Sequence, residues 1–313
     1  MKFSQYLILA LKGCAMGMAD VVPGVSGGTI AFISGIYEEL INSIRSIDIE
    51  AVKLLAKFRF ADFWRHINGR FLLPVLLGIG TAIFSLARLM TYLLTHHPIA
   101  IWSFLFGLII ASSLLVAKQV GHWNYKTITA FVIGAIAAWF ITVATPTETP
   151  TSWWFILLSG AIAICAMILP GISGAFILLL LGKYQYLMQA VGNLDIPVIL
   201  IFIVGAAAGI ISFSHLLAWL LKHWHDITVT LLMGFMVGSL NKVWPWKEVV
   251  ETYLDSHGKV QPLIESNVMP GRYEQLTQLD PQLTQAILFC IVGFLTISAI
   301  ELAAHLIVQK QKD

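Results

Sequence analysis

Apolar and polar stretches alternate along the chain in a pattern typical of helices that cross a lipid bilayer. At about 1.5 Å of rise per residue, a helix of about 20 apolar residues spans the ~30 Å hydrocarbon core. Six apolar stretches contain few or no charges and are predicted to be spans, although the fifth is short for one. They cover residues 72–94, 99–117, 127–144, 197–221, 228–240 and 283–307.

Two further apolar regions, residues 3–44 and 155–191, are each interrupted by a proline followed by a glycine, at Pro23 and at Pro170. Neither region offers an unbroken run of the required length, so each is predicted to form two half-spanning helices that meet at the break, a re-entrant hairpin. Non-helical backbone is stable at that depth only when protein buries it or when it lines a wet cavity.

The second half of the chain repeats the pattern of the first. Each half holds one broken region followed by three spans, so residues 1–151 form a first repeat and residues 152–313 a second. An odd number of spans places the second repeat in the opposite orientation. The predicted fold is therefore an all-α integral membrane protein of two inverted repeats, each a re-entrant helical hairpin plus three transmembrane helices. Aligned identical residues are Gly13 with Gly160, Gly35 with Gly182, Tyr37 with Tyr184, Gly78 with Gly205 and Gly107 with Gly234.

Lysine and arginine are concentrated in residues 45–70, among aromatic and apolar positions. This pattern is typical of an amphipathic basic segment that lies on an anionic cytoplasmic membrane surface. Basic and base-free loops alternate as the positive-inside rule requires, which predicts that the N-terminus and the C-terminus are both cytoplasmic. Residues 244–281 form a polar loop of mixed charge that is predicted to lie outside.

The composition agrees with a membrane protein, since 58% of the residues are hydrophobic and only 12% are charged. A net charge of +2 gives no indication of a nucleic-acid partner. The three cysteines are far apart and form no metal-ligand spacing, so we expect neither a metal nor a cofactor. HExxH and carboxylate-cluster patterns are missing from the sequence. Residues 24–28, GVSGG, match GxSxG by letter, but they lie in a break of an apolar helical region and not in the strand-to-helix turn of a hydrolase elbow, which argues against an enzyme.

The two breaks are the best candidates for a substrate site. A helix that begins after a break presents free backbone N–H groups and the positive end of its dipole, which suits a phosphate. Inverted repeats with paired broken helices are typical of secondary transporters, whose site lies near the midplane. The alternative is that the glycines only allow helices to pack closely. The candidate phosphate ligands are Gly24, Ser26, Gly27, Gly28, Thr29, Gly171, Ser173 and Gly174.

Two basic side chains at aligned positions extend this site. Arg88 lies inside a predicted span, where a charge is costly and is expected to face the protein interior. His215 occupies the equivalent position of the second repeat, and the pair is predicted to bind an anionic head group. Alternatively, Arg88 extends to the membrane interface and His215 is a packed structural histidine.

Acidic residues near the breaks are candidates for ion coupling. Asp20 lies three residues before the first break, whereas Met167 occupies the aligned position of the second. Asp20 either pairs with Arg88 or Lys12 or carries a proton. Glu301, which shares a helix face with His305, is a second proton-relay candidate, with a structural pair as the alternative.

Residues 20–29, with the sequence DVVPGVSGGT, and residues 169–174, with the sequence LPGISG, resemble the paired signatures of the bacterial polyprenyl-phosphate transporter family. The resemblance extends over essentially the whole chain. It implies a flippase of the bacterial inner membrane that returns undecaprenyl phosphate, the lipid carrier of cell-wall building blocks, from the outer to the inner leaflet. The second motif has Ala175 and Phe176 where the first has Gly28 and Thr29, so the two breaks are not equivalent.

Moving an anion inward opposes a negative-inside membrane potential, so we hypothesise proton coupling through Asp20, Glu301 or His215. The expected partners are the polyprenyl-phosphate lipid and the bilayer, and the sequence leaves the oligomeric state open. Two other functions compete with this interpretation. One is a transporter or channel for a small anion on the same scaffold, and the other is a membrane enzyme such as a lipid phosphatase.

Overall fold

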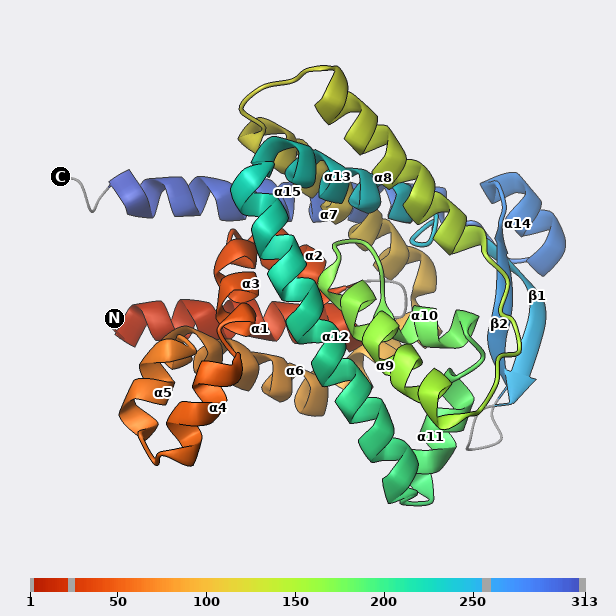
Figure 1. Ribbon diagram of the computed structural model, residues 1–313. Helices are drawn as coiled ribbons and strands as arrows, with labels where there is room; N and C mark the ends of the chain where they lie inside the picture. The colour runs from red at the N-terminus through yellow and green to blue at the C-terminus, as the bar shows by residue number, and fades with distance from the viewer. Residues whose placement is uncertain (1–2, 22–25, 255–259, 310–313) are drawn as a thin grey trace.

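The computed structural model describes residues 3–21, 26–254 and 260–309, and most of these residues are helical (Figure 1). The first half contains α1 Phe3–Val21, α2 Gly27–Ile33, α3 Tyr37–Arg45, α4 Ile49–Ala56, α5 Phe60–His66, α6 Gly69–His96, α7 Pro98–Gln119 and α8 Tyr125–Val143. The second half contains α9 Trp153–Ile168, α10 Gly174–Leu180, α11 Tyr184–Gly192, α12 Ile196–His223, α13 His225–Ser239, β1 Lys247–Leu254, β2 Val260–Asn267, α14 Pro270–Thr277 and α15 Leu283–Gln309.

Each half begins with a long helix, a break and two short helices. In the first half α1 is followed by α2 and α3, and in the second half α9 is followed by α10 and α11. The turn between the two short helices is made by Gly35 in one half and by Gly182 in the other, with φ of +71° and +62°. Glycine adopts this left-handed conformation without steric cost, so the repeated glycine has a repeated backbone role.

The six predicted spans coincide with α6, α7, α8, α12, α13 and α15. By length and composition, three helices of the described residues can cross a membrane, namely α7, α8 and α12. Up to five candidates result when each bent helix pair counts as one span, the bends being 76° between α5 and the first part of α6 and 107° between α10 and α11. The short run predicted at 228–240 remains short, since α13 has 15 residues.

Within each repeat, the first long helix packs closely on the first span, α1 on α6 and α9 on α12. A Cβ atom added to Gly78 of α6 would overlap the backbone of Ala10, and one added to Gly205 of α12 would overlap the backbone of Leu157. Backbones approach this closely only where glycine removes the side chain, as in other membrane helix pairs. The aligned glycines therefore make the same contact in both halves.

Between the repeats, the remaining spans exchange partners: α7 packs on α15, and α8 packs on α13. A Cβ atom at Gly107 of α7 would overlap the backbone of Cys290, and one at Gly234 of α13 would overlap the backbone of Phe131. The helix at the second predicted span of each half thus contacts the helix at the third predicted span of the other half.

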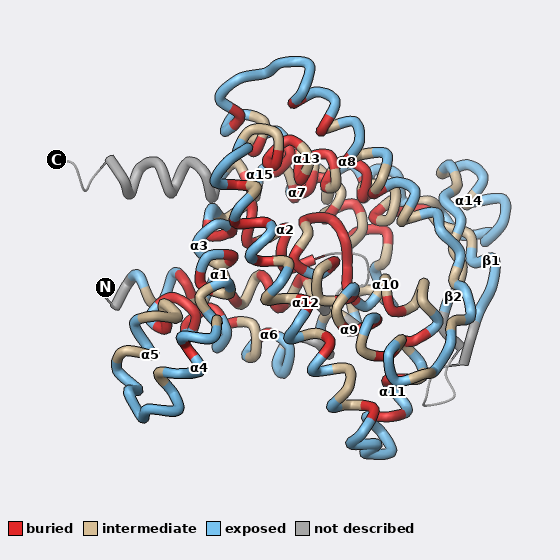
Figure 2. Tube along the Cα trace, in the orientation of Figure 1, coloured by how far each residue is buried: buried red, intermediate tan, exposed pale blue. Residues whose placement is uncertain are grey.

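Burial separates central helices from peripheral ones. In the apolar windows of the candidate spans, 61% of α7 is buried, against 22% of α8 and 17% of α12. Figure 2 shows buried residues concentrated where α2, α7 and α13 meet, while much of α8 and α12 is exposed or intermediate. Large apolar side chains such as Ile133, Ile136 and Phe140 of α8 remain exposed, which suits contact with lipid tails rather than water.

Two segments outside the long helices lie at opposite sides of the molecule. Figure 1 shows α4 and α5 near the start of α1, and β1, β2 and α14 on the far side. The predicted basic segment 45–70 contains the two short helices α4 and α5, with Ile49, Phe58 and Phe60 exposed among its basic residues. Such a face suits the membrane interface.

The prediction of a purely helical fold was wrong for the loop 244–281. There β1 and β2 form an antiparallel hairpin, in which Lys247 pairs with Asn267 and Leu254 pairs with Val260. Valine, threonine and tyrosine in the sequence KEVVETYL of β1 favour an extended backbone. This preference for strands was missed because the loop was judged by its polarity and mixed charge, which are also typical of irregular segments.

Candidate functional site

Residues next to the two breaks are hydrogen-bonded to each other. The breaks themselves, at Pro23 and Pro170, lie 147 positions apart in the sequence. Ser26 Oγ donates a hydrogen bond to the carbonyl oxygen of Met167 at 2.7 Å. The backbone N–H of Gly171 donates to Thr29 Oγ1 at 2.8 Å. The hydroxyl groups of Ser26 and Thr29 in the first motif are therefore hydrogen-bonded to backbone groups at the second break.

Tyr37 adds a third connection between the breaks. Its hydroxyl donates to the carbonyl oxygen of Ile168 at 3.2 Å, and its side chain is buried. Gly28 packs against the same segment, because an added Cβ atom would meet the carbonyl oxygens of Ile168 and Met167. Tyr37 and Tyr184 occupy aligned positions in the two halves, but neither was assigned a role from the sequence. This repetition of a tyrosine was the available sign that Tyr37 makes a specific contact.

Asp20 lies at the N-terminal end of α2. Its Oδ1 atom accepts a hydrogen bond from the N–H of Gly27 at 2.7 Å, and a Cβ atom at Gly27 would come within 2.5 Å of Oδ2. Ser26 caps the same helix by accepting from the N–H of Gly28 at 3.0 Å. A carboxylate thus occupies the position at which a helix N-terminus attracts an anion.

Lys12 contacts the opposite end of α2 and does not pair with Asp20. Its Nζ atom donates to the carbonyl oxygen of Ser34, the residue that ends this helix, at 2.7 Å. An acid at the N-terminus and a base at the C-terminus both complement the helix dipole. Because α1 supplies both side chains, it holds α2 in place at both ends.

The second break is built differently. Ser173 precedes α10, but within the described chain its side chain caps no backbone group of that helix. Gly171 has a φ of +88°, and a Cβ atom there would lie 2.8 Å from both the carbonyl oxygen of Phe235 and Ser239 Oγ of α13. Gly174 is buried against Ala163 of α9. The glycines of this break therefore allow close packing on α9 and α13.

The other sequence candidates are not gathered at the breaks by any described contact. His215 is exposed on α12, and its Nδ1 atom lies 2.8 Å from the carbonyl oxygen of Ile211. Gly24 lies outside the described residues. Arg88 lies on α6 and Glu301 on α15, and their side chains lie outside the described ones.

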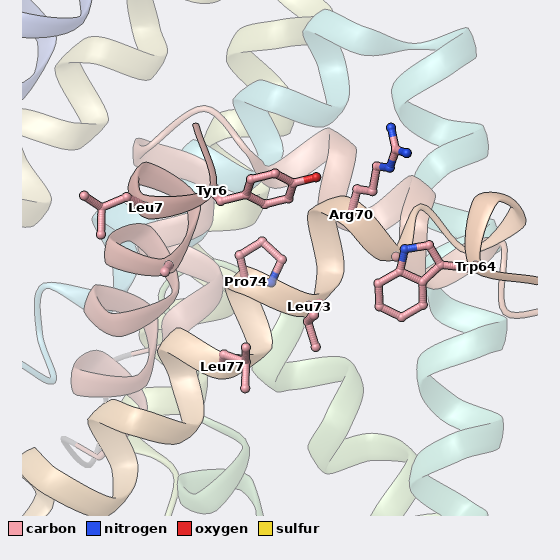
Figure 3. A pocket seen from close by; sticks show the side chains of 9 residues that line it. Tyr6, Leu7, Trp64, Arg70, Leu73, Pro74 and Leu77 are labelled. Atoms are coloured by element: carbon pink, nitrogen blue, oxygen red, sulfur yellow. The ribbon is translucent and has the colours of Figure 1, made fainter. Parts of the chain in front are cut away.

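A cavity of about 530 Å³ lies beside the basic segment, between α1, α5 and α6 (Figure 3). Its wall is mostly apolar, and Arg70 and the indole of Trp64 lie at its edge, as Figure 3 shows. An apolar groove with a cation at its rim suits a lipid chain whose head group carries negative charge. The lining residues are Tyr6, Leu7, Ala10, Trp64, Gly69, Arg70, Leu73, Pro74 and Leu77.

Comparison with known proteins gives consistent matches. The family model described as VCA0040-like, undecaprenyl phosphate translocase-like, matches residues 16–261, which include both breaks. A polyprenyl-phosphate transporter of Vibrio cholerae serotype O1 is 45% identical over 300 residues, or 96% of this chain and 97% of that relative. A polyprenyl-phosphate transporter of Staphylococcus aureus is 36% identical over 256 residues, or 75% of this chain and 85% of that relative. No solved structure matches this chain.

Proposed function

This chain belongs to the undecaprenyl phosphate translocase-like family, and we propose that it carries polyprenyl phosphate from the outer to the inner leaflet of the bacterial inner membrane. It is a multi-pass membrane protein. The single observation that carries the proposal is the direct contact between the two breaks, through Ser26, Thr29 and Gly171. That contact joins both halves at one polar point inside an apolar molecule.

We assign the phosphate to the N-terminus of α2, in competition with Asp20. The N–H of Gly27 already binds a carboxylate oxygen, so the local field favours a negative charge. When Asp20 turns away, a phosphate oxygen takes its place, and Ser26 and Thr29 supply hydroxyl donors after releasing Met167 and Gly171. Arg88 and His215 are the proposed cations for the head group at a later stage of the cycle.

Alternating access requires two halves that exchange roles, and we propose inverted repeats for that purpose. The exchanged packing of α7 with α15 and of α8 with α13 supports this arrangement. So does the placement of α4 and α5 at one side and the β1–β2 hairpin at the other, which we assign to the cytoplasm and to the outside. Both termini are then cytoplasmic.

Proton coupling follows from charge. Each negative charge moved inward against 100 mV costs about 2.3 kcal/mol. Protonation removes the negative charge of Asp20 and so weakens its hydrogen bond with the N–H of Gly27. A phosphate oxygen then replaces the carboxyl group more easily. We propose that Asp20 carries this proton and that Glu301 belongs to its path to the inside.

The test is flipping by the purified full chain in proteoliposomes. Labelled undecaprenyl phosphate placed in the outer leaflet becomes protected from an added, membrane-impermeant phosphatase when it moves inward. We expect protection to appear faster than in protein-free vesicles, and faster still with an inward proton gradient. Protection at the protein-free rate would refute the proposal.

The same vesicles test the two competing functions. Release of trapped chloride or inorganic phosphate without lipid flipping would identify a small-anion transporter. Formation of undecaprenol without any added phosphatase would identify a lipid phosphatase. We expect neither, because the site offers backbone and hydroxyl donors without a paired acid and base near the breaks in the part of the chain that the structure describes.

A further inference from the structure

Two lysines share one carboxylate at the side of the molecule that carries the β-hairpin. Lys242 follows the end of α13, and Lys247 begins β1. The Nζ atom of each lies 3.3 Å from the same oxygen, Oε2 of Glu265 on β2. The two ammonium groups are therefore no more than twice that distance apart, close enough for one phosphate group to contact both.

Aromatic rings hold both lysines in place. Lys242 Nζ lies 4.6 Å from the ring centroid of Phe176, and Lys247 Nζ lies 4.1 Å from the ring centroid of Trp102. A cation over an aromatic face is attracted by the ring and keeps its remaining N–H donors free to bind an anion. The lysines are thus oriented without being fully neutralised.

This cluster adjoins the second break. Phe176 belongs to α10, the short helix that starts just after the break. Gly171 of the break packs on Phe235 and Ser239 of α13, and Lys242 comes three residues after that serine. Lys242 therefore lies next to the second break, and Lys247 joins it through their shared partner Glu265. The first break has an acid, Asp20, at its equivalent end.

With both lysines charged, the cluster has a net charge of about +1, because Glu265 supplies one negative charge for two lysines. The side chain of Lys247 is only 8% exposed, so water screens this excess poorly. Burial lowers the pKa of Lys247 to about 8, against the raising effect of Glu265. A buried cation in this state is stabilised by any anion that can reach it.

We propose that Lys242 and Lys247 bind the phosphate head group of the lipid substrate as it enters from the outer leaflet, and that Glu265 is the counter-ion which the phosphate displaces. The inference rests on the proposed function, since it places an entry site on the transport path. The ligand class is a phosphate monoester attached to a long apolar chain. Its tail stays in lipid while the head group passes the hairpin.

A purely structural role makes a different prediction for Glu265. If the three side chains only fasten the hairpin to the helices, removal of any one of them has the same unfavourable effect. If the lysines are a binding site, removal of the carboxylate frees them. Glu265→Gln then strengthens phosphate binding, while substitution of either lysine weakens it.

The experiment measures binding of farnesyl phosphate to the full chain in nanodiscs of neutral lipid, by titration calorimetry at pH 7. We expect Lys242→Gln and Lys247→Met each to weaken binding about 10-fold. Lys247→Arg keeps the charge and is expected to bind nearly as the unmodified protein does. Arg272→Gln, on an exposed position of α14 at the same side, is the matched control and leaves binding unchanged. Thermal unfolding of each variant verifies its fold.

Unchanged binding in both lysine variants would overturn the inference, as would a Glu265→Gln variant that loses affinity with them. Farnesol and inorganic phosphate distinguish the possible ligands. We expect both to bind more weakly than farnesyl phosphate, and equal, lysine-dependent binding of inorganic phosphate would overturn the lipid assignment.

Flipping assays on the same variants separate this inference from the proposed function. Flipping by the lysine variants at the unmodified rate, under limiting substrate, would remove the entry site and leave the transport proposal intact. Lysine-dependent binding by a protein that does not flip the lipid would leave the site and remove the transport.

Discussion

The two helix breaks have nearly the same sequence and opposite charge environments. The first is closed by an acid of its own repeat, since Asp20 accepts from the N–H of Gly27. The second has Met167 at the aligned position in place of an acid. Phe176, just after this break, carries the ammonium group of Lys242 over its ring. One break thus holds an internal anion, and the other faces an excess of cations.

We propose that this difference gives the two breaks different tasks. In the proposed cycle, the anionic substrate is attracted first to the side with excess positive charge, near the second break. It then reaches the first break by displacing the carboxylate of Asp20, and that exchange is the step to which we assign the proton.

The largest expected effect comes from separating the two breaks. In Gly28→Val, the new side chain overlaps the carbonyl oxygen of Ile168, and the breaks must move apart. We expect flipping in proteoliposomes to fall about 100-fold, as for other sites displaced by about an ångström. Gly80→Ala on α6 is the control, since a Cβ atom there has open space and alanine favours a helix. Equal rates in the two variants would contradict a shared site.

The next effect concerns the acid of the first break. Asp20→Asn keeps an oxygen that can accept from the N–H of Gly27 but removes the charge that a proton would neutralise. Without a co-transported proton, an opposing potential of 100 mV reduces inward accumulation by up to about 50-fold for one charge. The measurement is flipping with and without an imposed proton gradient. A variant that still responds to the gradient would remove Asp20 from the coupling.

A smaller effect tests the hydrogen bond between the breaks. Thr29→Val leaves the buried N–H of Gly171 without its acceptor, which we expect to lower the free energy of unfolding by about 1–3 kcal/mol. Thr29→Ser retains the hydroxyl and loses one methyl group, at a cost of about 0.8 kcal/mol. Denaturant unfolding in detergent compares the two. If serine is as damaging as valine, the hydrogen bond does not hold the breaks together.

The smallest effect is a pH dependence of the lysine cluster beside the β-hairpin. Since the pKa of Lys247 is lowered to about 8, this side chain loses its charge as the pH rises past that value. Glu265 and Lys242 are the charged groups that face it, and Trp102 of α7 covers it. Because loss of this charge weakens binding about 10-fold, affinity for farnesyl phosphate is expected to be about threefold lower at pH 8.5 than at pH 7.

Lys247→Arg provides the comparison, because arginine stays charged throughout this range. The ligand contributes little to this pH dependence, since the second pKa of a phosphate monoester is about 6 and the group is already about nine-tenths doubly ionised at pH 7. An identical loss of affinity in the arginine variant would assign the titration to another group.

The breaks and their repetition could be predicted from the sequence because they depend on local chemistry. A proline followed by a glycine in the middle of an apolar run interrupts a helix there. Aligned pairs such as Gly78 with Gly205 indicated the repetition, and the structure places both glycines in the same kind of close helix contact. Helices form at the six predicted spans because apolar runs of that length favour them, although only α7, α8 and α12 among the described helices are by themselves long and apolar enough to cross a membrane. These features need no knowledge of which segments meet.

The charge environment of each break could not be predicted, because it depends on tertiary contacts. Lys247 and Glu265 belong to the predicted loop 244–281, which was interpreted only as polar with mixed charge, and Lys242, just before that loop, was assigned no role. The β-hairpin brings Lys247 near Glu265, and a tertiary contact adds Lys242. Asp20 was expected to pair with a basic side chain or to carry a proton, and its observed partner is the backbone N–H of Gly27. Sequence patterns do not reveal a backbone group as a partner for a charge.

The most direct test of the central claim asks where the phosphate travels. A polyprenyl phosphate with a photoreactive group next to its phosphate is flipped by the protein in vesicles, irradiated, and located by mass spectrometry of the labelled peptides. We predict labelling of the segments around Ser26 and Met167, suppressed by excess undecaprenyl phosphate. Labelling confined to the lipid-facing surface of α8, around Phe140, would contradict a path through the two breaks.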